Sequence, residues 1–200
     1  MIHNQADDGT LRAWWTVVVL TIAYLFSMVD RHVLTLLIEP IKGDLQISDT
    51  QIGLLTGVAF GVAYSIGGLP LGRIADRFSR KKVVLSGVFV WSLMTIACGL
   101  SRNFGVLFVA RMGVGIGEAA LTPASHAIIA SSFPPGKVGR AMSVFQLGAF
   151  FGLGVALLLG GAIVGWLERF GPIGLPGVGT LAVWQSALVL VGVLTRLWMI

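Results

Sequence analysis

The chain alternates between long apolar stretches and short polar connections. The apolar stretches lie at residues 13–38, 51–71, 83–100, 105–130, 141–166 and 179–200. Each is close to the length of about 20 residues that an α-helix needs to cross the hydrocarbon core of a bilayer. Because the connections are short, consecutive helices are expected to be antiparallel neighbours. The pattern predicts an all-α integral membrane protein, a bundle of six transmembrane helices preceded by a polar tail at residues 1–12.

Local signals mark several helix ends and contacts. Ser48 and Gln51 stand at the spacing of a capping box, at the start of the second stretch. Pro123 lies inside the fourth stretch and predicts a kink there. Glycines four residues apart let helices approach closely in lipid, and the second stretch is the best case for such packing. Its glycines are Gly53, Gly57 and Gly61, and the same spacing recurs at Gly113 and Gly117 in the fourth stretch and at Gly148 and Gly152 in the fifth.

The basic residues divide unequally between the two sides of the bundle. One side carries Arg12, Arg73, Arg77, Arg80, Lys81, Lys82, Lys137 and Arg140, and the other carries Lys42, Arg102 and Arg169. Cytoplasmic connections carry the excess of Lys and Arg in membrane proteins. The tail at residues 1–12 is therefore predicted to be cytoplasmic.

Composition agrees with the membrane assignment. Hydrophobic residues make up 56% of the chain and charged residues 12%, with a mean hydropathy of +0.88, whereas soluble domains have about 25% charged residues. The net charge of +5 does not indicate nucleic-acid binding, because the basic residues stand at helix ends where topology explains them. The single cysteine, Cys98, lies in an apolar stretch, which excludes a disulfide framework or cysteine metal cluster.

Four charged residues lie inside predicted membrane spans. They are Asp30 and Arg31 in the first, and Arg111 and Glu118 in the fourth. A charge at the centre of a bilayer costs about 3 kcal/mol or more, so such residues persist where they pair or line water. A functional site is the first hypothesis, and the alternative that these charges only hold two helices together stays open.

The spacing groups these charges with other polar residues. Arg111, Glu118 and Ser125 are seven apart and share one helical face, flanked by Thr122 and His126. Tyr24, Ser27 and Arg31 form a similar stripe in the first span. We expect the two stripes to face one cavity, with an ion pair between Asp30 and Arg111 completed by Arg31 and Glu118.

Within this cluster Glu118 is the first candidate for a proton carrier, because its depth is closest to the membrane centre. His126 is a second candidate, as a proton relay or a substrate contact, and a hydrogen-bonded histidine with neither role is equally compatible with the sequence. Further candidates for the substrate cavity come from both stripes and from the last two spans: Tyr24, Ser27, Thr122, Ser125, Gln146 and Gln185.

Two motifs resemble those of the major facilitator superfamily. The connection after the second span matches the family's signature at Gly72, Asp76, Arg77, Arg80 and Lys81, and departs from it at Ser79. The fourth span matches the Arg-x-x-x-Gly-x-Gly pattern at Arg111, Gly115 and Gly117. The resemblance implies a secondary transporter in which the signature residues form a conformational switch.

A subfamily is also indicated. Asp30-Arg31, the stretch at residues 115–124 and Phe133-Pro134-Pro135 are similar to the spinster-like transporters and their bacterial relatives. The resemblance implies that Asp30, Arg31, Glu118 and Arg111 carry proton coupling, and that the protein lies in the bacterial inner membrane. The acid common at the inner end of helix four is replaced here by Ser131 and Ser132, which weakens its charge relay.

The resemblance also bears on chain length. Family members have twelve helices in two six-helix halves, so this chain corresponds to the N-terminal half without the C-terminal bundle. We expect half of a proton-coupled carrier for a small organic anion or an amphiphilic, lipid-like substrate, completed by a C-terminal half or a second copy. The alternatives are a truncated or half-size membrane protein without transport and a homodimeric half-transporter. No motif indicates an enzyme, a metal or a cofactor beyond a proton gradient.

Overall fold

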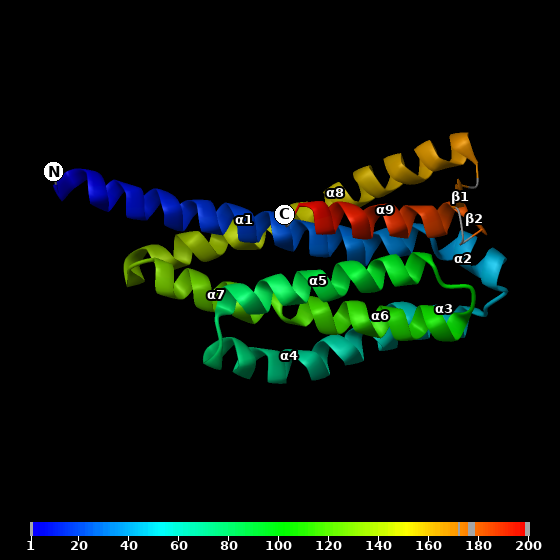
Figure 1. Ribbon diagram of the computed structural model, residues 1–200, viewed down its shortest axis with the longest axis horizontal. Helices are drawn as coiled ribbons and strands as arrows, with labels where there is room; N and C mark the ends of the chain where they lie inside the picture. Colours follow the sequence, from blue (N-terminus) through cyan, green and yellow to red (C-terminus); the bar gives the residue numbers. More distant parts are fainter. Residues whose placement is uncertain (1, 172, 176–178, 199–200) are drawn as a thin grey trace.

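The computed structural model describes residues 2–171, 173–175 and 179–198. Its long helices lie side by side along the long axis of the molecule (Figure 1). In chain order the elements are α1 (Ile2–Leu36), α2 (Ile38–Leu45), α3 (Asp49–Gly53), the π-helix η1 (Leu54–Ala59), α4 (Phe60–Arg77), α5 (Arg80–Gly99), α6 (Phe104–Ala119), α7 (Leu121–Ser132), α8 (Pro135–Phe170), the antiparallel strands β1 (Ile173–Leu175) and β2 (Gly179–Leu181), and α9 (Val183–Leu197).

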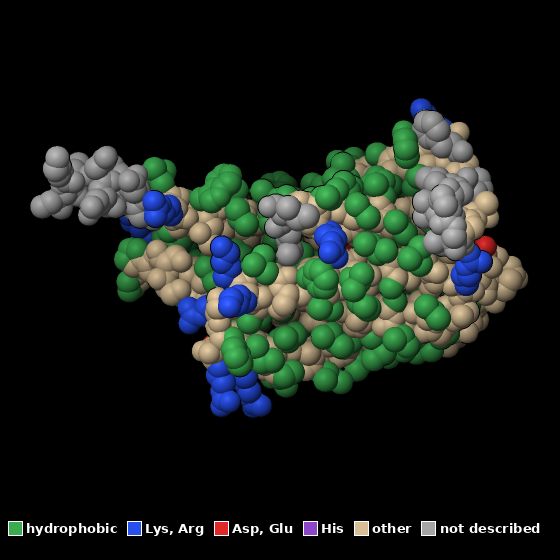
Figure 2. All heavy atoms as spheres, viewed as in Figure 1, with side chains coloured by type: hydrophobic (Ala, Val, Ile, Leu, Met, Phe, Trp, Pro, Cys, Tyr) green, Lys and Arg blue, Asp and Glu red, His purple; other side chains and the backbone are tan. Residues whose placement is uncertain are grey.

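The bundle has the surface of a multi-pass membrane protein. Five helical runs are long and apolar enough to cross a membrane, and α9 is a shorter apolar helix. Large apolar side chains stay exposed on the flanks, including Leu69, Phe150 and Leu158, as expected for contact with lipid. Figure 2 shows these apolar flanks, with Lys and Arg gathered at the end where α4 turns into α5.

Several helices extend beyond the predicted spans. α1 begins at Ile2, so the backbone of the tail is helical, and α8 covers 135–170 where the prediction was 141–166. The predicted start of the sixth span at 179 was wrong, because residues 179–181 form β2 and the helix begins at Val183. Hydropathy predicts only the part of a helix that lies in lipid, whereas backbone hydrogen bonds continue the helix beyond that part.

The predicted signature loop is also shorter than expected, because the helix before it extends beyond the predicted span. α4 continues to Arg77, so Gly72 and Asp76 lie within a helix, and the connection to α5 consists of residues 78–79. At the other end of this span, the predicted capping box is present: Ser48 accepts from the amide of Gln51, whose side chain accepts from the amide of Ser48. The second span is therefore one helical run, α3–η1–α4, interrupted only by a widened π-helical turn.

The fourth span breaks where the proline predicts it. α6 ends at Ala119 and α7 begins at Leu121, and the amide of Ala120 bonds to the carbonyl of Gly117 at 3.3 Å. Proline lacks an amide hydrogen, so Pro123 leaves the carbonyl one turn earlier without its helical partner. The break, at Ala120, falls two residues after Glu118.

Close helix contacts use the glycine pairs of the fourth and fifth stretches, as their spacing predicts, but not the glycines of the second stretch. A side chain on Gly148 of α8 would come within 2.6 Å of the carbonyl of Thr21, and one on Gly117 within 2.6 Å of the amide of Trp91. The three glycines of the second span instead meet nothing within 4 Å, so their predicted packing is wrong within the described residues. The tight contacts join α8 to α1 and α6 to α5.

Gly148→Ala should destabilise the bundle. A methyl group at this position meets a backbone carbonyl that is unable to move aside, and overpacking of this kind costs about 1–3 kcal/mol. Gly154→Ala is the matched control on α8, because its Cβ would meet nothing within 4 Å. Thermal unfolding in detergent should show a lower midpoint for Gly148→Ala alone, and equal midpoints would contradict the α1–α8 packing described.

Candidate functional site

Ser27, Arg31 and Glu118 form the centre of the site. Ser27 and Arg31 lie one helical turn apart on the same face of α1. The Oγ of Ser27 donates to Oε2 of Glu118 at 2.7 Å, and Nη2 of Arg31 donates to the same oxygen at 2.8 Å. Glu118 is buried, whereas the side chain of Arg31 is 31% exposed. The site therefore joins a buried carboxylate on α6 to a guanidinium that is reachable from outside.

The ion pair differs from the predicted one. Within the described residues Asp30 and Arg111 form no ion pair, and Arg31 binds Glu118 instead. Asp30 accepts a hydrogen bond from Oγ1 of Thr95 on α5 at 2.6 Å, and Arg111 donates to the backbone carbonyl of Arg31 at 3.3 Å. Adjacent residues point about 100° apart around a helix, so Asp30 and Arg31 face different neighbours.

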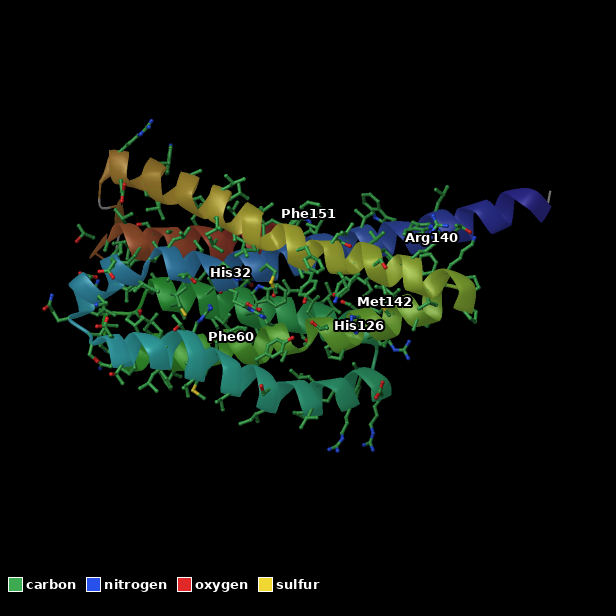
Figure 3. All side chains as sticks on the ribbon, turned by 180° about the vertical axis from the view of Figure 1, so that it is seen from behind. His32, Phe60, His126, Arg140, Met142 and Phe151 are labelled. Atoms are coloured by element: carbon green, nitrogen blue, oxygen red, sulfur yellow. The ribbon has the colours of Figure 1, made fainter. Side chains whose placement is uncertain are left out.

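Two aromatic residues of α4 complete the site. Phe60 and Tyr64, which we call the aromatic shelf, stack with ring centroids 5.6 Å apart. The guanidinium of Arg31 lies 4.4 Å from the Phe60 centroid and 5.3 Å from that of Tyr64, and the guanidinium of Arg111 lies 5.0 Å from that of Phe60. Figure 3 shows Phe60 on the α4 ribbon among the helices of the bundle.

Sequence reasoning missed the shelf and Thr95. Phe60 and Tyr64 are four apart and so share a helical face, which was the available signal. Their position relative to the charges depends on η1, because this π-helical segment directly precedes Phe60. A π-helical turn contains an extra residue, and the sequence gives no sign of it.

Several polar atoms in and around the cluster lack a hydrogen-bond partner among the described residues. They are Asp30 Oδ1, Arg31 Nε, Arg111 Nε, Glu118 Oε1, Trp91 Nε1 and Ser125 Oγ, all of them buried. Unpartnered buried polar groups are costly and call for an explanation such as bound water, protons or ligand. The free oxygen of Glu118 is therefore available for a proton.

Other predicted residues surround the cluster at greater distance. Tyr24 stacks on Phe145 of α8 with centroids 4.9 Å apart, and the ring of His126 meets the edge of the same phenylalanine at 5.5 Å. Thr122 lies 3.4 Å from the hydroxyl of Tyr64. Tyr24, Thr122 and His126 are all partly exposed.

The structure separates the two glutamines and buries the serine of the α7 stripe. Gln146 is exposed on α8, while Ser125 is buried. Gln185 lies at the start of α9, where its side chain donates to the carbonyl of Ser101 at 2.8 Å and accepts from the amide of Ala182. Gln185 therefore caps α9 at one end of the bundle and does not join the cluster.

The signature residues lie at the opposite end of α5 from that cap. Nη1 of Arg80 donates to the carbonyl of Ala127 at 2.9 Å and to Oγ of Ser131 at 3.0 Å, which anchors the start of α5 to the end of α7. Asp76, Arg77 and Lys81 are exposed. Ser131 thus occupies the place of the expected acid and binds the arginine as a neutral acceptor.

Comparison with known proteins identifies the family. The Major Facilitator Superfamily model matches residues 20–200, and the chain belongs to this superfamily. An MFS-type efflux pump of Mycolicibacterium smegmatis is 36% identical over 171 residues, which cover 84% of this chain and 40% of that protein. A probable galactarate/D-glucarate transporter of Escherichia coli is 33% identical over 83% of this chain and 37% of its own length.

A solved structure agrees with the subfamily resemblance. The chain matches a bacterial homologue of the human lysosomal transporter Spinster, in an inward-facing and occupied conformation, with a TM-score of 0.83 and 33% identity. The match covers 92% of this chain and 42% of that one. The chain thus spans about two fifths of the length of its relatives. They are transporters, in agreement with the expectation that the chain is not an enzyme.

A double-mutant cycle tests the observed ion pair. Arg31→Ala and Glu118→Ala should each lower the thermal midpoint, and the double variant should lose less than their sum, with a coupling of about 1–3 kcal/mol. Asp30→Asn combined with Arg31→Ala should show a smaller coupling, because these side chains share no hydrogen bond. A larger coupling for that control pair would contradict the geometry.

Proposed function

We propose that this chain is part of a secondary active transporter, which couples proton movement to the passage of a small organic anion or an amphiphilic, lipid-like molecule by alternating access. The observation that carries the proposal is the buried Glu118 carboxylate, held through one oxygen by Ser27 and Arg31 and free at the other. The proton gradient is then the coupling ion, without a further cofactor.

The charge balance of the cluster supports a proton role. Two arginines, Arg31 and Arg111, face two carboxylates, Asp30 and Glu118, so the cluster is neutral when both acids are ionised. A proton on Glu118 weakens its hold on Arg31 and leaves a net positive charge in a poorly solvated place. An anionic substrate at Arg31 restores the balance, which links proton binding to substrate binding.

The exposure of the two arginines supports a division of roles. Arg31 is partly exposed, whereas Arg111 is 3% exposed and is bound to the α1 backbone. Arg31 is therefore the residue for an anionic group, and the aromatic residues suit apolar parts of a substrate. The named cargo of one relative, a sugar acid, has such an anionic group.

Alternating access requires more chain than this. The relatives are longer, and transporters of this family move one helical bundle against another. We place the N-terminus in the cytoplasm and the protein in the bacterial inner membrane. The exposed Asp76 on α4 is then available to a C-terminal half, and Arg80 keeps the α4–α5 turn fixed on α7.

Glu118→Gln tests the proton role in the protein expressed from its own gene. In proteoliposomes with an imposed pH gradient, uptake of galactarate or of lysophosphatidylglycerol should fall on the order of 100-fold, as expected when an acid–base group is removed. Glu168→Gln is the control, because that carboxylate is exposed at the end of α8. Unchanged uptake with unchanged pH dependence would disprove the proton role of Glu118.

Arg31→Gln tests the anion site. Binding of galactarate, measured by titration calorimetry, should weaken about 10- to 100-fold, the value of a charge-assisted hydrogen bond. Binding of uncharged amphiphiles should change much less. Arg196→Gln on α9 is the control, since its guanidinium lies over Phe89 and away from the cluster. Equal affinity of the Arg31 variant and the parent for galactarate would exclude this arginine as the anion site.

A further inference from the structure

The structure assigns a positioning role to the aromatic shelf of α4. We infer that Phe60 and Tyr64 hold the guanidinium of Arg31 against Glu118 through their ring faces, and so set how readily Glu118 takes up a proton. This inference rests on the proposed proton role of Glu118, and it adds residues from a helix that carries none of the cluster's charges.

The first observation concerns the contacts of the Arg31 guanidinium. Its guanidinium makes one ion pair, with Glu118, while its Nε is buried without a partner among the described residues. The remaining face of the guanidinium lies over Phe60 at 4.4 Å and Tyr64 at 5.3 Å, within the range of a cation–π attraction. The aromatic shelf therefore contacts the Arg31 guanidinium in addition to Glu118.

The second observation is that Phe60 contacts two like charges. Arg111 approaches the same ring at 5.0 Å, and it too has a buried Nε without a described partner. Two guanidiniums repel each other, and the negative faces of one aromatic ring attract both. Phe60 is 7% exposed, so little water is present to replace it in this role.

The third observation is that close backbone packing between α4 and α6 holds the shelf in place. A side chain at Gly115 of α6 would lie 2.7 Å from the carbonyl of Phe60 and 3.2 Å from the amide of Tyr64, so α4 and α6 touch at the shelf. The π-helical segment η1 ends immediately before Phe60, and such turns are frequent at functional sites. The shelf is thus held in place by α6, which also carries Glu118 and Arg111.

The other titratable groups around Glu118 remain in place when Phe60 is changed. α1 contributes Asp30 and Tyr24, α6 contributes Arg111, and α4 contributes Tyr64 itself, all within electrostatic reach of the cluster. α5 contributes Cys98, near Arg111 and Asp30. His126 of α7 contacts Phe145 of α8. A change at Phe60 removes none of these groups, so its effect on Glu118 passes through the two arginines.

The experiment follows the protonation of Glu118 directly. The protein expressed from its own gene is reconstituted in lipid nanodiscs, and the infrared band of the protonated carboxyl that Glu118→Gln removes is titrated against pH. In Phe60→Leu, Arg31 loses its aromatic support and holds Glu118 less firmly. The midpoint should rise by about 0.4–1.5 pH units, equivalent to about 2- to 30-fold, the range of a cation–π contact.

Shape and folding are controlled by a fluorinated series at position 60 and by one variant elsewhere. Phenylalanines with one, two and three ring fluorines at position 60 keep the packing and weaken the negative face of the ring, so the midpoint should rise in steps. Phe89→Leu removes the ring beneath Arg196 on the flank of the bundle, 4.6 Å from that guanidinium, and should leave the midpoint unchanged.

The outcomes separate the inference from the function on which it rests. A Glu118 band whose midpoint is the same in the parent, in Phe60→Leu and in the fluorinated series overturns the role of the shelf and leaves the proton role intact. A shift in Phe60→Leu without steps in the fluorinated series also overturns it, because packing alone then explains the shift. The absence of any titrating Glu118 band overturns the shelf and the proton role together.

Discussion

An ion pair between Arg31 and Glu118, placed within a bundle whose surroundings are apolar, is the interaction on which the arrangement of this protein depends. Neither charge is stable at this depth alone, since an isolated charge in a membrane costs several kcal/mol. The pair joins α1 to α6 through the side chains of Ser27, Arg31 and Glu118.

Glycines let the neighbouring helices pack closely against the two helices that carry this pair. Gly117 brings α6 against the backbone of α5, and Gly115 brings it against α4 at Phe60. Gly148 and Gly152 bring α8 against α1 on the other side. Without a hydrophobic driving force between helices in lipid, such close approach is a main source of stability. The helices that carry the charged residues are consequently packed against their neighbours at short range, and the ion pair itself is made by side chains that reach from α1 to α6.

Irregular backbone is concentrated around the same level of the bundle. The widened turn η1 comes immediately before Phe60, and the break at Ala120 comes two residues after Glu118. Irregular helices within a membrane are tolerated where neighbouring groups satisfy the freed backbone or where they line a cavity. Because η1 comes just before the shelf, it affects how Phe60 and Tyr64 are turned about the helix axis. The break at Ala120 does the same for Thr122 and His126 on α7.

The amino-acid sequence by itself determined the membrane class, the order of the apolar helices, the break at Pro123, the capping box at Ser48 and the family, because each depends on local pattern or on a motif. It also indicated the four charged residues, since a charge in an apolar stretch is conspicuous. Only the tertiary structure decided that Arg31 binds Glu118, that Asp30 turns to Thr95, that Gln185 caps α9 and that Phe60 contacts two arginines. These partners depend on how each helix is rotated about its axis, and that rotation is set by packing between distant segments and by the extra residue in η1.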